Sequence, residues 1–214
     1  MKIGVLGTGD VGKSLGKAFL ALGHEVKMGA REAGNEKAAA WVKEGGAKAS
    51  AGTFADAAAF GEIVVLCTLG SANRSVLEQA GASNLAGKVL IDTTNPLDFS
   101  RGFPPSLALS GNDSGGEQVQ RVAPGAKVVK AFNIVGNAHM FKPSFPGGTP
   151  DMFICGNDGG AKKRVTELLT DFGWNTTDLG GIECSRYLEA MCMVWVLYAA
   201  RTNQWNHAFK MVRK

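Results

Sequence analysis

The sequence lacks the features that usually place a protein in a membrane or around a metal ion. Its longest uninterrupted apolar run, residues 190–200, is about half as long as a membrane-spanning helix requires. The four cysteines form no CxxC pair, and the three histidines lie far apart in the chain. Residues 1–2 lead directly into an apolar strand, so we expect no signal peptide, no membrane segment, no bound metal and a cytoplasmic location.

Neither sign of charge predominates strongly. The 214 residues carry 23 Lys and Arg against 19 Asp and Glu, a formal net charge of +4 that is spread along the chain. No stripe of cations is interleaved with aromatic residues, although such a stripe is typical of a nucleic-acid-binding surface. We therefore expect no nucleic-acid partner. With 45% hydrophobic residues, the chain can bury an ordinary globular core.

Short apolar runs alternate with segments of helical spacing. Strands are expected at 2–7, 25–30, 47–50, 62–68, 88–94 and 127–132, with helices between most of them. The Pro- and Gly-rich residues 96–116 are expected to form a long loop, and loops of that length are usually functional. A strand, a helix and a strand follow over 152–180, and a last helix starts near Glu183. This order predicts an α/β fold, a doubly wound Rossmann-type parallel sheet with a small C-terminal αβ extension and terminal helix.

The first strand runs into GTGDVG, a match to the pattern GxGxxG. The pattern alone is weak, but here it follows an N-terminal strand and opens a helix that leads to a second strand, which is the context of a dinucleotide site. Gly7 permits the tight turn, Gly9 lets a pyrophosphate approach the backbone, and Gly12 lets helix and strand pack closely. Free N–H groups at the helix N-terminus attract the phosphates. The predicted phosphate-binding residues are Gly7, Thr8, Gly9, Asp10, Val11 and Gly12.

The end of the second strand predicts which dinucleotide is bound. NAD sites usually place an acid there to bind the ribose 2′-hydroxyl, whereas an arginine accommodates the 2′-phosphate of NADP. Here Met28, Gly29 and Ala30 are uncharged, and the first charged side chain is Arg31. A guanidinium matches the oxygens of a phosphate two at a time. The sequence therefore predicts NADP(H) as cofactor, with Ala30, Arg31 and Asn35 at the 2′-phosphate end.

Several stretches together resemble the family of coenzyme F420-dependent NADP oxidoreductases. They include KIGVLGTGDVG at the start, TTNPL (93–97), PGAKVVKAFN (124–133), MFICGND (152–158) and the segment beginning RYLEAMCMVWVLYAA near the end. The likeness extends to the soluble reductase domain of membrane metalloreductases that use a flavin. It covers nearly the whole chain, and the KVVKAFN and RYLE segments are its more specific parts.

The resemblance implies roles for particular residues. Residues 8–11 would wrap the pyrophosphate and Arg31 would hold the 2′-phosphate. Cofactor contacts toward the nicotinamide would come from Thr68, Leu69, Gly70, Asn95, Pro96 and Asn133. Substrate contacts beside the ring would come from Ile134, Val135, Gly136, Asn137 and His139. Residues 1–135 would then form the NADP-binding Rossmann domain, and residues 136–214 an extension that completes the cleft and supplies the dimer interface.

The expected activity is hydride transfer between NADPH and a flavin or deazaflavin, with F420, FAD or FMN as the hydride partner. Two face-to-face rings need little acid–base help, so no side chain is predicted to be catalytic. Two other functions remain open. An NADPH-dependent reductase of a small carbonyl or imine would need a proton donor near the substrate, and no Tyr-x-x-x-Lys or His–carboxylate pattern supplies one. A redox sensor would bind NADP(H) without oxidising it.

The last helix is apolar at nearly every position from Tyr187 to Ala200. A helix that is apolar on all sides is normally buried, and the sheet of so small a chain can cover only one of its sides. We therefore predict a two-fold homodimer in which a second copy covers the other side, as the family resemblance also implies. The alternative is a helix inserted into a cleft of its own monomer.

Overall fold

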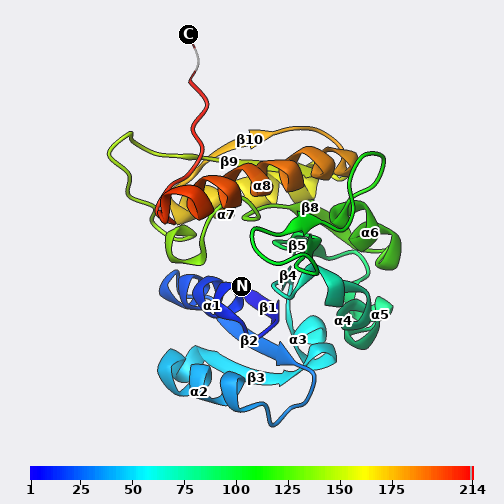
Figure 1. Ribbon diagram of the computed structural model, residues 1–214. Helices are drawn as coiled ribbons and strands as arrows, with labels where there is room; N and C mark the ends of the chain where they lie inside the picture. Colours follow the sequence, from blue (N-terminus) through cyan, green and yellow to red (C-terminus); the bar gives the residue numbers. More distant parts are fainter. Residues whose placement is uncertain (213) are drawn as a thin grey trace.

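The computed structural model describes residues 1–212 and 214, and its elements follow the expected order (Figure 1). The strands are β1 (Lys2–Leu6), β2 (Glu25–Ala30), β3 (Ala49–Thr53), β4 (Ile63–Leu66), β5 (Val89–Asp92), β6 (Leu97–Asp98), β7 (Ser106–Leu107), β8 (Lys127–Lys130), β9 (Asp151–Gly156) and β10 (Asn175–Asp178). The helices are α1 (Asp10–Ala21), α2 (Glu36–Gly45), α3 (Phe54–Phe60), α4 (Asn73–Ala80), α5 (Ala82–Leu85), α6 (Gly115–Val122), α7 (Gly159–Phe172) and α8 (Ser185–Thr202).

One sheet contains all of these strands except β6 and β7. Its order is β10-β9-β8-β5-β4-β1-β2-β3, and neighbouring strands are parallel except for β8 and β9. From β1 the chain first winds outward through β2 to β3, then returns to the other side of β1 and continues from β4 outward. The predicted doubly wound, Rossmann-type fold is confirmed. The carboxyl ends of β1 and β4 meet at the switch point, where ligands bind in such folds.

Side chains that alternate along the strands fill two separate cores. In β4, Ile63 and Val65 join the core that α1, α2 and α7 cover, whereas Val64 and Leu66 join the core beneath α3, α4 and α6. The sheet is therefore buried on both faces, which explains why its central strands read as continuous apolar runs. Over residues 1–212 and 214, no helix combines the length and apolar character needed to cross a membrane.

The segment 96–116, expected as a loop, contains a small antiparallel hairpin. Leu97 of β6 pairs with Leu107 of β7, and the Ala108 N–H donates to the Pro96 carbonyl at 2.7 Å. Strands of two residues are too short to give a period-2 pattern, so no sequence signal marked them. The hairpin follows the carboxyl end of β5 and contacts α8, which places it over the ligand-binding edge of the sheet.

Helix α8 is covered on one side only. Its inner side chains are Leu188, Cys192, Trp195, Val196 and Ala199, all buried. On the outside, Tyr187 is 68% and Val194 58% exposed, and Leu197 and Tyr198 are about half exposed. The alternative that α8 lies in a cleft of its own monomer is therefore wrong, because these four apolar side chains face outward in the single chain.

Candidate cofactor and substrate site

The turn between β1 and α1 has the backbone that a phosphate loop needs. Gly7 adopts φ +129°, which side chains rarely allow, and a Cβ there would lie 2.5 Å from the Cys67 carbonyl oxygen. A Cβ on Gly12 would lie 2.3 Å from the Gly7 oxygen, whereas one on Gly9 would meet nothing within 4 Å. Gly7 and Gly12 thus permit close packing, and Gly9 leaves the backbone open toward the cleft.

Helix α1 begins at Asp10 without a side-chain cap, since its N-cap residue is Gly9. The N–H groups of its first turn have no intrahelical acceptor, and the helix dipole adds partial positive charge there. This combination is suited to an anion such as a pyrophosphate. Gly12 contributes from behind the turn, through packing, and does not line the cleft.

A cleft of about 660 Å³, here called the main cleft, runs across the carboxyl ends of β1, β2 and β4. The predicted residues that line it are Gly7, Thr8, Gly9, Asp10, Val11, Ala30, Arg31, Asn35, Thr68, Leu69 and Asn137. It is also lined by residues that sequence reasoning missed, namely Phe54, Cys67, Ala72, Ser75, Val76 and Gln79. These residues come mainly from α3 and α4. No local sequence pattern indicated that these helices pack over the end of β4.

Arg31 follows the last residue of β2 and is exposed at one end of the main cleft. Among the described ion pairs none involves Arg31, so its guanidinium is not neutralised by the adjacent Glu32. The Asn35 Oδ1 atom accepts from the Ala38 N–H at 3.1 Å and so caps α2. The amide nitrogen of Asn35 has no partner among the described hydrogen bonds and is left to donate to a ligand.

A second cavity of about 260 Å³, the strand-end cavity, adjoins the main cleft between the ends of β4 and β5. Its lining residues are Val11, Cys67, Thr68, Leu69, Gly70, Ser71, Thr93, Thr94, Asn95, Leu97 and Phe99. The main cleft shares Val11, Cys67, Thr68 and Leu69 with it. A Cβ on Gly70 would lie 2.2 Å from the Asn95 carbonyl oxygen, so Gly70 lets the two strand ends approach.

A third cavity of about 280 Å³, the aromatic cavity, continues from the strand-end cavity toward α8. Both cavities are lined by Val11, Thr93, Asn95, Leu97 and Phe99. The other lining residues of the aromatic cavity are Phe103, Pro105, Phe132, Asn133, Val135, Met140, Cys192, Trp195, Val196 and Trp205. Trp205 lies after α8, with its ring centroid 5.3 Å from that of Trp195. The tail thus returns to complete this wall.

Exposed apolar side chains gather around these cavities. Leu69 is 75% exposed, and Phe99, Phe103 and Trp205 are each about half exposed. All four line the main cleft, the strand-end cavity or the aromatic cavity. Apolar surface of this kind next to a concave site commonly marks a ligand-binding position.

The other residues predicted to contact the cofactor or the substrate lie in different parts of the structure. Val135 and Asn133 line the aromatic cavity, whereas Gly136, Asn137 and His139 line a neighbouring surface cavity of about 580 Å³. Ile134 is buried in the core, and neither it nor Pro96 lines any of these cavities. His139 packs against Phe145 with tilted rings, whose centroids are 5.2 Å apart. Within 134–139, therefore, Asn137 also lines the main cleft and Val135 lines the aromatic cavity, whereas Gly136 and His139 lie beside the site.

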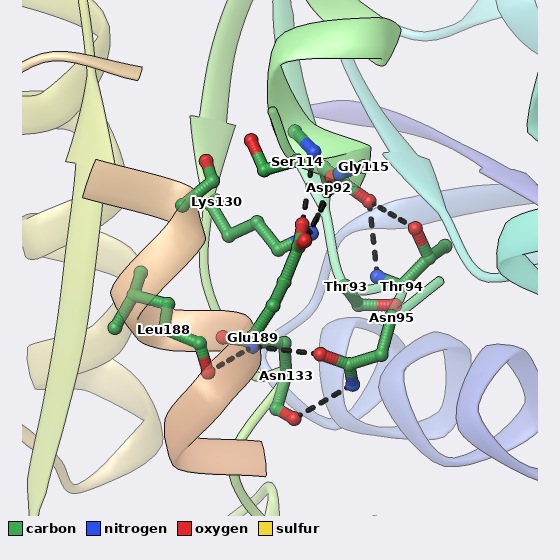
Figure 2. Close-up of polar contacts among 12 residues, drawn as sticks. Asp92, Thr93, Thr94, Asn95, Ser114, Gly115, Lys130, Asn133, Leu188 and Glu189 are labelled. Carbon is green, nitrogen blue, oxygen red and sulfur yellow. Dashed lines mark hydrogen bonds and ion pairs between the residues drawn. The ribbon is translucent and has the colours of Figure 1, made fainter. Parts of the chain in front are cut away.

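Asn95 and Asn133 hold the ends of β5 and β8 together (Figure 2). The Asn133 Nδ2 atom donates to the Asn95 Oδ1 atom and to the Leu188 carbonyl, both at 2.9 Å. The Asn95 Nδ2 atom donates to the Asn133 carbonyl at 2.9 Å. These acceptors fix the orientation of both amides. The Asn133 Oδ1 atom is left buried without a hydrogen-bond partner among the described residues.

The strand-end and aromatic cavities contain no side chain suited to donate a proton near neutral pH. None of their lining residues is Asp, Glu, His, Lys, Arg or Tyr. Burial raises the pKa of the Cys67 and Cys192 thiols to about 12, so both are neutral. Among the described residues, no cluster of three or more His, Cys, Asp or Glu could hold a metal ion.

The fold is of the Rossmann class, and the main cleft lies at its switch point, where dinucleotides bind in proteins of this class. Residues 2–96 match the model of the family described as NADP oxidoreductase, coenzyme F420-dependent. The F420-dependent NADP reductase of Methanocaldococcus jannaschii is 34% identical over 201 residues, which cover 89% of each chain. The chain therefore belongs to the family of coenzyme F420-dependent NADP oxidoreductases, and the resemblance expected from the sequence is confirmed. It is an NADP-dependent oxidoreductase.

Other similarities place this assignment in context. A solved structure from Arthrobacter sp. FB24, provisionally assigned as an F420-dependent NADP reductase, is 42% identical with a TM-score of 0.93 and full coverage of both chains. The metalloreductase STEAP3 of Rattus norvegicus is 30% identical over 190 residues, but the chain spans only 36% of its length. An imine reductase of Streptomyces aurantiacus, 20% identical with a TM-score of 0.67 over 96% of this chain and 64% of that one, shares the fold.

Proposed function

We propose that the protein binds NADP(H) across the main cleft and the strand-end cavity and exchanges hydride with a flavin or deazaflavin ring in the aromatic cavity. The observation that carries the proposal is the continuity of the three spaces through shared lining residues, combined with the lack of an Asp, Glu, His, Lys, Arg or Tyr among the described lining residues of the strand-end and aromatic cavities. Bound NADPH supplies the hydride, and the protein holds the two rings together.

The fit of the chain to NADP(H) rests on its own residues. The uncapped α1 N-terminus and the open Gly9 backbone would receive the pyrophosphate. Arg31, which forms no ion pair among the described residues, would bind the 2′-phosphate with the amide of Asn35 beside it. Phe54 and Gln79 would border the adenine. The strand-end cavity, with Thr68 and Asn95, would receive the nicotinamide.

The aromatic cavity would receive the acceptor. Its wall includes rings from the hairpin segment (Phe99 and Phe103), from α8 (Trp195) and from the tail (Trp205). Flat tricyclic rings gain stacking energy from such walls. The relatives named as F420-dependent NADP reductases favour a deazaflavin, and a flavin has the same flat tricyclic outline. F420, FAD and FMN are therefore the acceptors to compare.

The test is anaerobic mixing of the purified protein and NADPH with F420, FMN, FAD and riboflavin in turn, following nicotinamide absorbance. The proposal expects oxidation of NADPH with at least one of these acceptors and little oxidation without one. A protein that binds NADPH tightly but oxidises it with none of them would instead be the redox sensor. Turnover of a small carbonyl or imine alone would point to the other reductase activity.

In this proposal residues 1–135 bind the dinucleotide, and residues 136–214 complete the cleft through Trp195 and Trp205. The outward side chains of α8 then contact a second copy of the chain. Tyr187, Val194 and Leu197 expose apolar side chains along the outer side of α8, and contiguous exposed apolar surface commonly marks an interface between proteins. We expect a homodimer by light scattering at micromolar concentration, and a monomer would remove this part of the proposal.

A further inference from the structure

A buried ionic cluster of Asp92, Lys130 and Glu189 joins β5, β8 and α8 (Figure 2). The Lys130 Nζ atom lies 2.9 Å from the Asp92 Oδ2 atom and 2.7 Å from the Glu189 Oε1 atom, and none of the three side chains is more than 1% exposed. Asp92 and Lys130 are register partners on β5 and β8, so they project from the same face of the sheet. Glu189 reaches them from α8.

The single positive charge of Lys130 faces two carboxylates, and backbone N–H groups of α6 offset the remaining negative charge. Burial alone would lower the pKa of the Lys130 ammonium, but the carboxylates of Asp92 and Glu189 reverse the effect and hold this pKa above its usual range. The second carboxylate is offset by the first N–H groups of α6, because Gly115 and Gly116 donate to Glu189 at 2.9 and 3.0 Å. Lys130 is thus a fixed cation and cannot serve as a proton donor.

One end of the cluster continues to the wall of the strand-end cavity. Thr94 donates to the Asp92 Oδ1 atom through its N–H at 3.0 Å and its hydroxyl at 2.7 Å. The Asn73 Nδ2 atom donates to the Thr94 hydroxyl at 2.7 Å, and the Thr68 hydroxyl donates to the Asn73 Oδ1 atom at 2.9 Å. Thr68 and Thr94 both line the cavity.

The other end continues to the wall of the aromatic cavity. Leu188, next to Glu189, receives the hydrogen bond from Asn133. Cys192, Trp195 and Val196, the next inward-facing residues of α8, line the aromatic cavity. One unbroken set of hydrogen bonds and ion pairs therefore joins Thr68 on one wall to the helix that forms the other.

We propose that Lys130 and Glu189 are positioning residues that fix the distance between the nicotinamide wall and the acceptor wall. This inference rests on the proposed function. Buried ion pairs contribute little net stability compared with apolar residues of the same volume, so stability alone does not account for such a cluster. Hydride transfer, by contrast, is sensitive to the separation of donor and acceptor, and a displacement of about 1 Å can cost about two orders of magnitude in rate.

The test compares three variants by single-turnover kinetics with NADPH and with NADPH deuterated at C4. Glu189→Gln keeps the shape of the side chain but removes the charge opposite Lys130. Thr94→Val cuts the chain at the cofactor end without changing any charge. Leu85→Ala is the matched control, because Leu85 is buried in the core beneath α3, α4 and α6 and lines neither cavity.

We expect Glu189→Gln and Thr94→Val to transfer hydride about tenfold more slowly or worse, with a more temperature-dependent isotope effect and NADPH affinity within twofold of the parent. Leu85→Ala is compared with the network variants at an equal loss of melting temperature. Per folded molecule, it should keep the hydride-transfer rate and the isotope effect of the parent protein. A parent-like rate and isotope effect in both network variants would overturn the inference, as would an equal loss in Leu85→Ala.

A readout that needs no acceptor separates this inference from the proposed function. The fluorescence lifetime of bound NADPH reports how firmly the nicotinamide is held. If the parent transfers hydride to no flavin or deazaflavin, the proposed function fails, and the lifetime alone then decides on the network. A shorter lifetime in Thr94→Val, with Leu85→Ala unchanged, supports the positioning role at the nicotinamide wall, and an unchanged lifetime in Thr94→Val contradicts it.

Discussion

Asn95 and Asn133 bind each other through two hydrogen bonds of 2.9 Å, one from each amide nitrogen, at the point where the two inner cavities meet. The pair fixes the carboxyl ends of β5 and β8 relative to each other. The Asn133 Nδ2 atom donates both of its hydrogens within the protein, whereas the Asn95 Nδ2 atom keeps a second N–H beyond its bond to the Asn133 carbonyl. The pair is therefore a structural part of the site that retains an amide N–H for a ligand.

Replacement of Asn133 should impair the enzyme without abolishing it. Asn133→Ala leaves Asn95 and the Leu188 carbonyl without a donor, which should lower the unfolding free energy by about 1–3 kcal/mol. We expect turnover to fall by no more than about 10²-fold, because the cofactors carry the chemistry. His139→Ala, outside the aromatic cavity, should have a smaller effect. If His139→Ala abolished turnover while NADPH still bound, His139 would be a proton donor and the carbonyl or imine reductase would replace our proposal.

Arg31→Ala should separate the two nicotinamide dinucleotides. Loss of a charge-assisted hydrogen bond to the 2′-phosphate should weaken NADPH by about 1.5–3 kcal/mol, or roughly one to two orders of magnitude in Kd. NADH, which lacks that phosphate, should bind almost unchanged. Lys37→Ala is the control for a nearby loss of positive charge, and it should affect NADPH less. Equal losses for both dinucleotides in fluorescence titrations of Arg31→Ala would contradict the assignment.

Gly136→Leu tests how closely the 134–139 segment is packed against α8. A Cβ at Gly136 would lie 3.3 Å from the Trp195 ring, so the rest of a leucine side chain must displace that ring. Because Trp195 forms a wall of the aromatic cavity, turnover should fall further than in Asn133→Ala, while NADPH affinity changes little. Steady-state kinetics with the best acceptor measures the first effect. Parent-like turnover would show that Trp195 does not set the shape of the acceptor site.

The buried thiols give a pH dependence of stability with a definite sign. Burial raises the pKa of Cys67 from 9.0 to about 12, so the folded thiol stays neutral while the unfolded one ionises. The unfolded state then binds fewer protons, and the unfolding free energy falls as pH rises above 9, by up to about 1.4 kcal/mol per pH unit for one thiol. Cys67→Ala should therefore lose less stability than the parent between about pH 8 and about pH 10 in urea titrations. Parallel losses in both proteins would contradict the raised pKa.

The sequence was sufficient for the features that depend on local pattern. The glycines of the β1–α1 turn and the uncharged strand end before Arg31 predicted the main cleft, which indeed brings these residues together. The hairpin of β6 and β7 and the return of Trp205 to Trp195 depend on contacts between distant segments, and no period in the sequence indicates them. Asp92 and Lys130 did leave a signal, since each is a charged residue that ends a buried apolar run. Such residues need a partner when buried, but the sequence could not show that Glu189 completes the cluster.

The most direct test of direct ring-to-ring transfer uses NADPH stereospecifically deuterated at C4 and a deazaflavin acceptor under anaerobic conditions. A hydride that reaches the C5 carbon of a deazaflavin stays in a C–H bond, so a transferred deuterium does not exchange with water. We predict that mass spectrometry finds one deuterium per reduced acceptor from one of the two C4 positions and none from the other. Reduced acceptor without deuterium from either position, or NADPH consumed with no reduced acceptor at all, would contradict the account.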